Sequence, residues 1–155
     1  MPTFNSIAEI EKYAQLLIKK SQQTQNSNVR KTVGQSNTRK VESEVYAKYD
    51  PKEYDRRGRD GGLADERSIE VTSVQSSGGT TQVILENTVE GADSLRGKPL
   101  LDTIENTIPN DWYNPNGEWV EGRPFINAIV DELKDGNELR QSLVKDLKSV
   151  GLEVL

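Results

Sequence analysis

Apolar residues recur at a helical period at both ends of this chain and alternate at a strand period in its middle. Near the amino terminus, steps of three and four residues place apolar side chains on one face of a helix. That stripe consists of Ile7, Ile10, Ala14, Leu17 and Ile18. Ser6 and Glu9 have the spacing of a capping box, so a helix is predicted to begin after Ser6 and to reach about Gln22.

A second helix is predicted after a break at Asn26 to Asn28. Its apolar residues recur every four residues, except that the polar Asn37 stands at one of these positions. They are Val29, Val33, Val41 and Val45. The helix is expected to reach about Lys48, with thin apolar cover.

The middle of the chain has the pattern of a β-hairpin. Ile69, Val71 and Ser73 alternate with Glu70, Thr72 and Val74, and Thr80 to Leu85 is rich in β-branched and apolar residues. Gln75, two serines and two glycines separate the runs, and the Ser-Ser-Gly-Gly sequence suits a tight turn.

At the carboxy terminus, Pro124 is predicted to open a long amphipathic helix, because proline is favoured in the first helical turn. Its apolar side is expected to carry Phe125, Ile126, Ile129, Val130, Leu133, Leu143, Leu147 and Val150. Gly136-Asn137 is the expected place for a kink or split, and Gly151 suits the end.

Together these patterns predict an α+β fold, with long amino-terminal and carboxy-terminal amphipathic helices packed on a small antiparallel sheet. A chain of 155 residues is expected to form one domain. The expected parts are helices over 6–48, a loop over 49–67, strands and loops over 68–122 and a final helix over 124–150. Within 68–122 we expect a short helix at 99–104 and packing of Trp112, Tyr113 and Trp119 on the sheet.

The hydrophobic fraction of 33% predicts a thin core. Folding stability is a small difference between the free energy of burial and the cost in chain entropy. A thin core therefore favours a protomer whose apolar burial is completed by a partner subunit. The net charge of −5 argues against a surface made for nucleic acid or anionic lipid. No window approaches the ~18 apolar residues of a membrane span, so we expect a chain that stays in the cytoplasm where it is made, without membrane contact.

The chain contains no histidine and no cysteine, which removes the commonest general base, the thiolate nucleophile and the commonest transition-metal ligands. Carboxylate pairs such as Asp131 with Glu132, or Asp50 with Glu53, have the pattern of solvated surface charge. We therefore predict no enzyme activity, no catalytic residues, no cofactor and no metal site.

The segment from Tyr46 to Asp65 combines aromatic, arginine and glycine residues. It holds Tyr46, Tyr49, Tyr54, Arg56, Arg57 and Arg59. Gly58, Gly61 and Gly62 permit positive φ there. One interpretation is a solvated loop that covers the sheet edge, and another is a tyrosine cluster with Pro51 and Leu63. The arginines suit either phosphate contacts or ion pairs with the flanking Asp55 and Asp60.

The pattern Val45-Tyr46-x-x-Tyr49-x-Pro51-x-x-Tyr54-x-Arg56-Arg57, followed by Gly61-Gly62-Leu63-x-Asp65, resembles a segment of the small neck or minor tail-completion proteins of long-tailed bacteriophages. Gly122-Arg123-Pro124-Phe125-Ile126 is similar to the element with which many members start their last helix. Ile104-Glu105 and Trp112 also stand where that family tends to carry an Ile-Glu pair and an aromatic residue.

The resemblance implies a virion protein that forms a homo-oligomeric ring at the head-tail junction. Its partners would be portal, adaptor or head-closure proteins on one side and tail-tube or tail terminator proteins on the other, with non-specific contact to packaged DNA. The candidate subunit-interface or channel residues are Tyr46, Tyr49, Pro51, Tyr54, Arg56, Arg57, Arg59, Arg123 and Phe125.

Three other functions remain open at this stage: a tail terminator ring that caps the tail tube, a phage-encoded nucleic-acid-binding adaptor, and an enzyme that uses carboxylates or a Tyr-Lys pair. The role of Arg123 also has two interpretations. It either braces the loop before Pro124 or faces the channel as a DNA contact.

Overall fold

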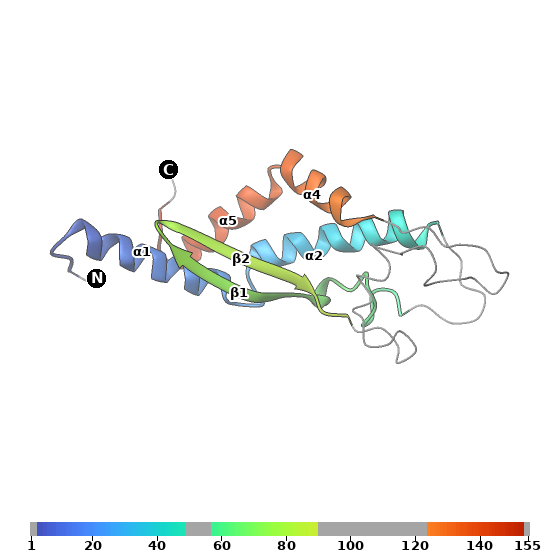
Figure 1. Ribbon diagram of the computed structural model, residues 1–155, viewed down its shortest axis with the longest axis horizontal. Helices are drawn as coiled ribbons and strands as arrows, with labels where there is room; N and C mark the ends of the chain where they lie inside the picture. Colours follow the sequence, from blue (N-terminus) through green and yellow to red (C-terminus); the bar gives the residue numbers. More distant parts are fainter. Residues whose placement is uncertain (1–2, 49–56, 90–123, 154–155) are drawn as a thin grey trace.

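The computed structural model describes residues 3–48, 57–89 and 124–153, and within them the predicted α+β class is confirmed. Figure 1 shows an elongated arrangement of helices beside one β-hairpin. In chain order the elements are α1 (Ile7–Gln22), α2 (Asn28–Lys40), the π-helix η1 (Val41–Tyr46), the 3₁₀-helix η2 (Glu66–Ser68), β1 (Ile69–Ser77), β2 (Thr80–Asn87), α4 (Ile126–Asp135) and α5 (Glu138–Ser149).

Helix α2 is the central element. It contacts α4, α5, η2 and β1, while α1 contacts α5 and both strands. In Figure 1, α2 lies between the α4–α5 pair and the hairpin. The expectation that the terminal helices pack on the sheet is thus met by α1, whereas α4 and α5 pack mainly on α2.

The predicted helix starts are confirmed in the first half of the chain. The Ser6 hydroxyl accepts a hydrogen bond from the Glu9 amide at 3.3 Å, and the Glu9 carboxylate accepts one from the Asn5 amide at 2.7 Å. Ser27 lies within the predicted break and caps α2, since its hydroxyl accepts from the Arg30 amide at 3.1 Å. The second helix reaches Tyr46, and its last six residues are π-helical.

The carboxy-terminal helix differs from its prediction at the start. It begins at Ile126 rather than Pro124, because Phe125, whose ring is buried in the core, occupies the N-cap position. The helix is split at Gly136 and Asn137, as the sequence suggested. Gly151 has φ +85°, and its amide donates to the Lys148 carbonyl at 3.0 Å, which ends α5 in a Schellman motif.

The predicted hairpin is confirmed, with Ser77 opposite Thr80 at the turn and Ile69 opposite Asn87 at the open end. Gly78 and Gly79 both have positive φ, the conformation that a two-residue hairpin turn requires. A register shift between Val71 and Ser73 introduces a bulge into β1.

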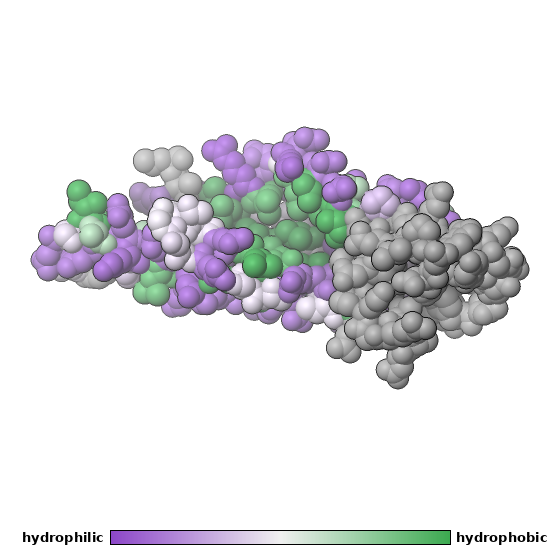
Figure 2. Space-filling model, viewed as in Figure 1, coloured by the Kyte–Doolittle hydropathy of each residue, from purple (hydrophilic) through white to green (hydrophobic). Residues whose placement is uncertain are grey.

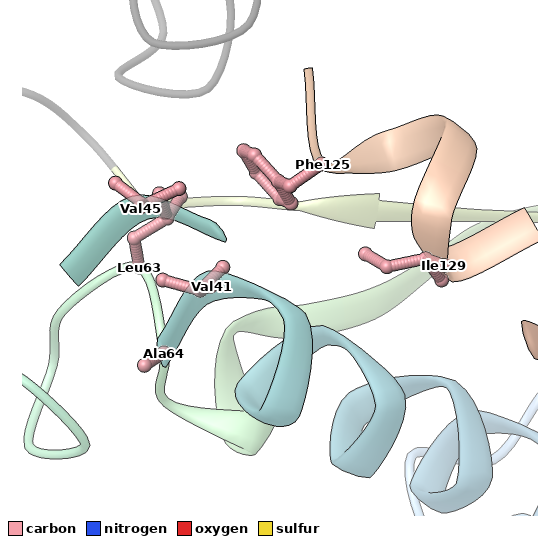
Figure 3. Packing of buried hydrophobic residues seen from close by; sticks show 6 residues of the cluster. All are labelled: Val41, Val45, Leu63, Ala64, Phe125 and Ile129. Carbon is pink, nitrogen blue, oxygen red and sulfur yellow. The ribbon is translucent and has the colours of Figure 1, made fainter. Parts of the chain in front are cut away.

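The main apolar core is small. It consists of Val41, Val45, Leu63, Ala64, Phe125 and Ile129, which come from η1, the loop before η2, and the start of α4 (Figure 3). Nine apolar residues are buried in the described chain, against eleven polar or charged residues. The interior is therefore as poor in apolar side chains as the composition predicts.

Candidate interaction surfaces

Asp146 of α5 fixes the start of α2 although it lies more than one hundred residues further along the chain. Its buried carboxylate accepts hydrogen bonds from the Asn28 amide at 2.7 Å, the Asn28 side chain at 2.7 Å and the Val29 amide at 3.0 Å. The Gln22 side chain donates to it at 3.3 Å. A carboxylate at a helix amino terminus satisfies free amides and complements the helix dipole. Asp146 thereby joins α1, α2 and α5.

The face of α2 turned toward residues 63–69 is also polar. Buried Arg30 donates from Nε to the Ile69 carbonyl at 2.6 Å and from Nη2 to the Glu66 carbonyl at 2.9 Å. Two further side chains hold the segment. Asn37 donates to the Leu63 carbonyl at 2.8 Å and Thr38 to the Ala64 carbonyl at 2.7 Å. Asn37, where the four-residue spacing of the valines is interrupted, therefore carries a side chain that donates a hydrogen bond.

The loop before β1 is organised by Asp65. Its carboxylate accepts from the Gly61 amide at 2.8 Å, the Arg67 amide at 2.9 Å and the Arg67 guanidinium at 2.7 Å. Hydrogen bonds from the Arg67 side chain are the main reason that the pKa of Asp65 lies well below its usual range. The same contact raises the pKa of Arg67, which also pairs with Asp60 at 3.1 Å.

Arg59, a predicted interface or DNA contact, forms an ion pair within the protomer. It donates from Nε and Nη2 to the two carboxylate oxygens of Glu42 at 2.6 and 2.8 Å. These hydrogen bonds lower the pKa of Glu42 and raise that of Arg59. The structure thus supports the ion-pair interpretation for Arg59, but its partner lies in η1 rather than beside it in the loop. Arg57 is exposed.

The glycines of this loop are required for two different reasons. Gly58 and Gly61 have positive φ, as predicted. Gly62, which could also adopt positive φ, does not. A Cβ at Gly62 would lie 2.5 Å from the Gly58 carbonyl oxygen, so this position needs glycine because the backbone passes close to it.

The other predicted interface residues fall into two groups. Tyr46 is half-buried against the core that contains Leu63, whereas Phe125 is fully buried. The expectation of a subunit or channel contact at Phe125 is corrected, because its ring is enclosed by the protomer's own core. Outside the described residues lie Tyr49, Pro51, Tyr54, Arg56 and Arg123, the acidic residues Asp50, Glu53 and Asp55, and the predicted elements of 90–122, with Ile104, Glu105, Trp112, Tyr113 and Trp119.

Glu132, which the sequence assigned to a solvated face, links α4 to α2. Burial raises its pKa, but hydrogen bonds from Arg39 and Lys40 outweigh this effect and hold the pKa below its usual value. Lys40 Nζ lies 3.1 Å from the carboxylate. Within the described ranges, no cluster of three or more acidic residues could hold a metal ion.

Among the described residues, the large apolar side chains with the greatest exposure lie on α1. Ile7 is 76% exposed, Leu16 is 60% exposed and Ile10 is 50% exposed, so the described chain leaves the first half of the predicted apolar stripe uncovered. The reason is visible in Figure 1, where the beginning of α1 extends past the ends of α5 and the hairpin. Val130 of α4 and Leu143 of α5 are each 38% exposed. None of the helices in the described ranges combines the length and apolarity of a membrane span.

These features define a small α+β domain that is held together by polar contacts between helices and loops and turns apolar helix surface outward. The chain belongs to the YomN family, whose sequence profile matches residues 6–149. Searches of the curated proteins and of the solved structures found no match.

Proposed function

We propose that this protein is a structural subunit of a phage virion, a ring at the head-tail junction that joins the portal-bearing head to the tail. The observation that carries the proposal is the contrast between a largely polar interior and exposed apolar side chains on α1, α4 and α5. A subunit of an assembly is expected to leave such surface for its neighbours, because association buries apolar area that one chain cannot cover alone.

Two sequence observations support the choice of a phage assembly. The family name YomN suggests a phage-derived protein. The segment from Val45 to Asp65 and the Arg123-Pro124-Phe125 element resemble the neck and tail-completion proteins of long-tailed phages. We further propose that the protein acts stoichiometrically rather than as a catalyst, since the chain lacks histidine and cysteine.

Two of the described arginines, Arg59 and Arg67, favour this function over a nucleic-acid adaptor. Arg59 is paired with Glu42, and Arg67 is paired with Asp65 and Asp60. Guanidinium groups that are already held by carboxylates contribute less to phosphate binding than unpaired ones. A tail terminator ring would place the same kind of subunit at the end of the tail tube, and the experiment below separates the two locations.

The test is an amber mutation early in the gene, followed by electron microscopy of the lysate, with a suppressor host as the control. Separate DNA-filled heads and complete tails are the result expected for a neck ring. Tails of uncontrolled length would instead locate the ring at the tail end. Normal infectious particles that lack the protein would contradict the proposal.

A further inference from the structure

The first half of α1 carries an apolar surface that its own described chain leaves largely exposed. Ile7, Ile10 and Tyr13 are 76%, 50% and 36% exposed. The ring of Phe4 packs on Tyr13 with centroids 5.1 Å apart and adds to this surface. Further along the same stripe, Ala14, Leu17 and Ile18 are half-buried where α1 meets α5 and the hairpin. The exposed half therefore continues a face that already packs on the protein.

A second apolar surface lies on α4 and α5. The residues that α5 buries are the polar Ser142 and Asp146, so the neighbouring Leu143 is left partly exposed. On α4, Ile129 is buried and the adjacent Val130 is not. Figure 2 shows apolar surface gathered between the α4–α5 pair and the hairpin.

The charges beside the two surfaces are opposite. Glu11 lies one helical turn after Ile7, so an acidic group borders the α1 surface. Lys134 lies one turn after Val130, and Arg140 lies one turn before Leu143. All three charged side chains are exposed, and none has an ion pair with another described residue.

We infer that the first half of α1 docks on the apolar surface of α4 and α5 in a second copy of this chain, with Glu11 near Lys134 and Arg140 of that copy. The two surfaces cannot meet within one molecule, because the start of α1 extends away from α4 (Figure 1). Such a contact uses a different surface on each copy, so it can repeat from copy to copy, and it forms a ring where the rotation between copies closes. Only the closure into a ring depends on the proposed function, whereas the contact between the two surfaces does not.

The chain has no cysteine, which allows a direct test by crosslinking. Full-length Ile10→Cys and Val130→Cys proteins are purified separately, mixed, oxidised and analysed on a non-reducing gel. A mixed disulfide dimer is expected. Lys12→Cys is the matched control, because two residues further along the helix its side chain points to the other side. It is expected to crosslink with Val130→Cys at least several-fold less.

Two results would overturn the inference. Ile10→Cys that crosslinks chiefly with itself would show that two copies of α1 pair with each other. Crosslinking with Val130→Cys no stronger than that of the Lys12→Cys control would show that α1 does not reach α4. Neither result contradicts the proposed phage function, which the amber mutant tests. A negative amber result in turn does not contradict the contact, which the crosslink tests.

A charge exchange tests the orientation of the contact. Glu11→Lys is expected to weaken self-association several-fold in sedimentation experiments, and the combination with Lys134→Glu and Arg140→Glu is expected to restore it. Equal weakening in the single and combined variants would contradict the proposed pairing of these groups.

Discussion

Asp146 adds a second, long-range cap to α2, because it accepts from the Asn28 and Val29 amides while the local N-cap Ser27 accepts from the Arg30 amide. Replacing Asp146 with alanine leaves the first-turn amides of α2 and the Asn28 side chain without their acceptor in a buried site. We expect the free energy of unfolding to fall by about 3 kcal/mol, because hydrogen bonds to a buried charge and a helix cap are lost together. Urea denaturation measures this change.

Asp131→Ala is the matched control for that experiment, since Asp131 is exposed on α4. Its effect should stay within about 0.5 kcal/mol, as for most surface substitutions. Equal effects of the two variants would show that Asp146 does not hold the three helices together.

Asp65 makes the stability depend on acid pH. Its pKa in the folded chain is lowered by the Arg67 hydrogen bonds, whereas an unfolded aspartate has a pKa of about 3.9. A lowered folded pKa stabilises the protein above the unfolded value, and that stabilisation is lost as pH falls below it. The difference in stability between the wild type and Asp65→Asn should therefore shrink as the pH is lowered from 6 toward 3.

Denaturation of both proteins at several pH values measures this difference. Glu42, Glu44 and Glu132 also have lowered pKa values, so both proteins should lose stability in acid. A difference that stays constant over the range would contradict the role of Asp65.

At the scale of elements, Gly34 sets the distance between α2 and η2. A Cβ at this position would lie 2.8 Å from the Glu66 carbonyl oxygen, which accepts from Arg30. Gly34→Ala improves helix propensity by about 1 kcal/mol, but it forces the two elements apart at a cost of about 1–3 kcal/mol. We expect lower stability overall, measured by thermal unfolding. Gln35 is an exposed neighbour, so Gln35→Ala should not lower the unfolding temperature. A Gly34→Ala protein that is more stable than the wild type would argue against the close approach of α2 and η2.

The elements themselves could be predicted where the signal is local. The Ser6 cap, the two-glycine turn at Gly78 and the helix end at Gly151 each follow from the conformation that nearby residues require. The start of the last helix was misplaced by two residues, because the burial of Phe125 depends on Val41, Val45 and Leu63, which are remote in sequence.

The polar contacts could not be predicted, because they join residues far apart and have no periodic pattern. Arg30 and Asp146 have the sequence pattern of solvated charges, yet both are buried. The exposure of Ile7 and Ile10 was missed for the opposite reason. An amphipathic stripe indicates that a helix buries one face, but not whether its own chain or another molecule covers it.

On the scale of the whole molecule, a polar interior and exposed helix faces predict that association contributes to stability. The unfolding temperature should rise with protein concentration, since binding between folded copies stabilises them by mass action. Ile10→Asp should remove this dependence, while Lys12→Asp on the other side of α1 should keep it. Differential scanning fluorimetry over a range of concentrations measures the effect, and a concentration dependence that persists in Ile10→Asp would place the association elsewhere.

The central claim, that this chain is an assembly subunit, is tested most directly by sedimentation velocity of the full-length protein from low to high micromolar concentration. We predict one discrete species of several copies that gains population as concentration rises. A single monomeric species over the whole range would contradict the claim.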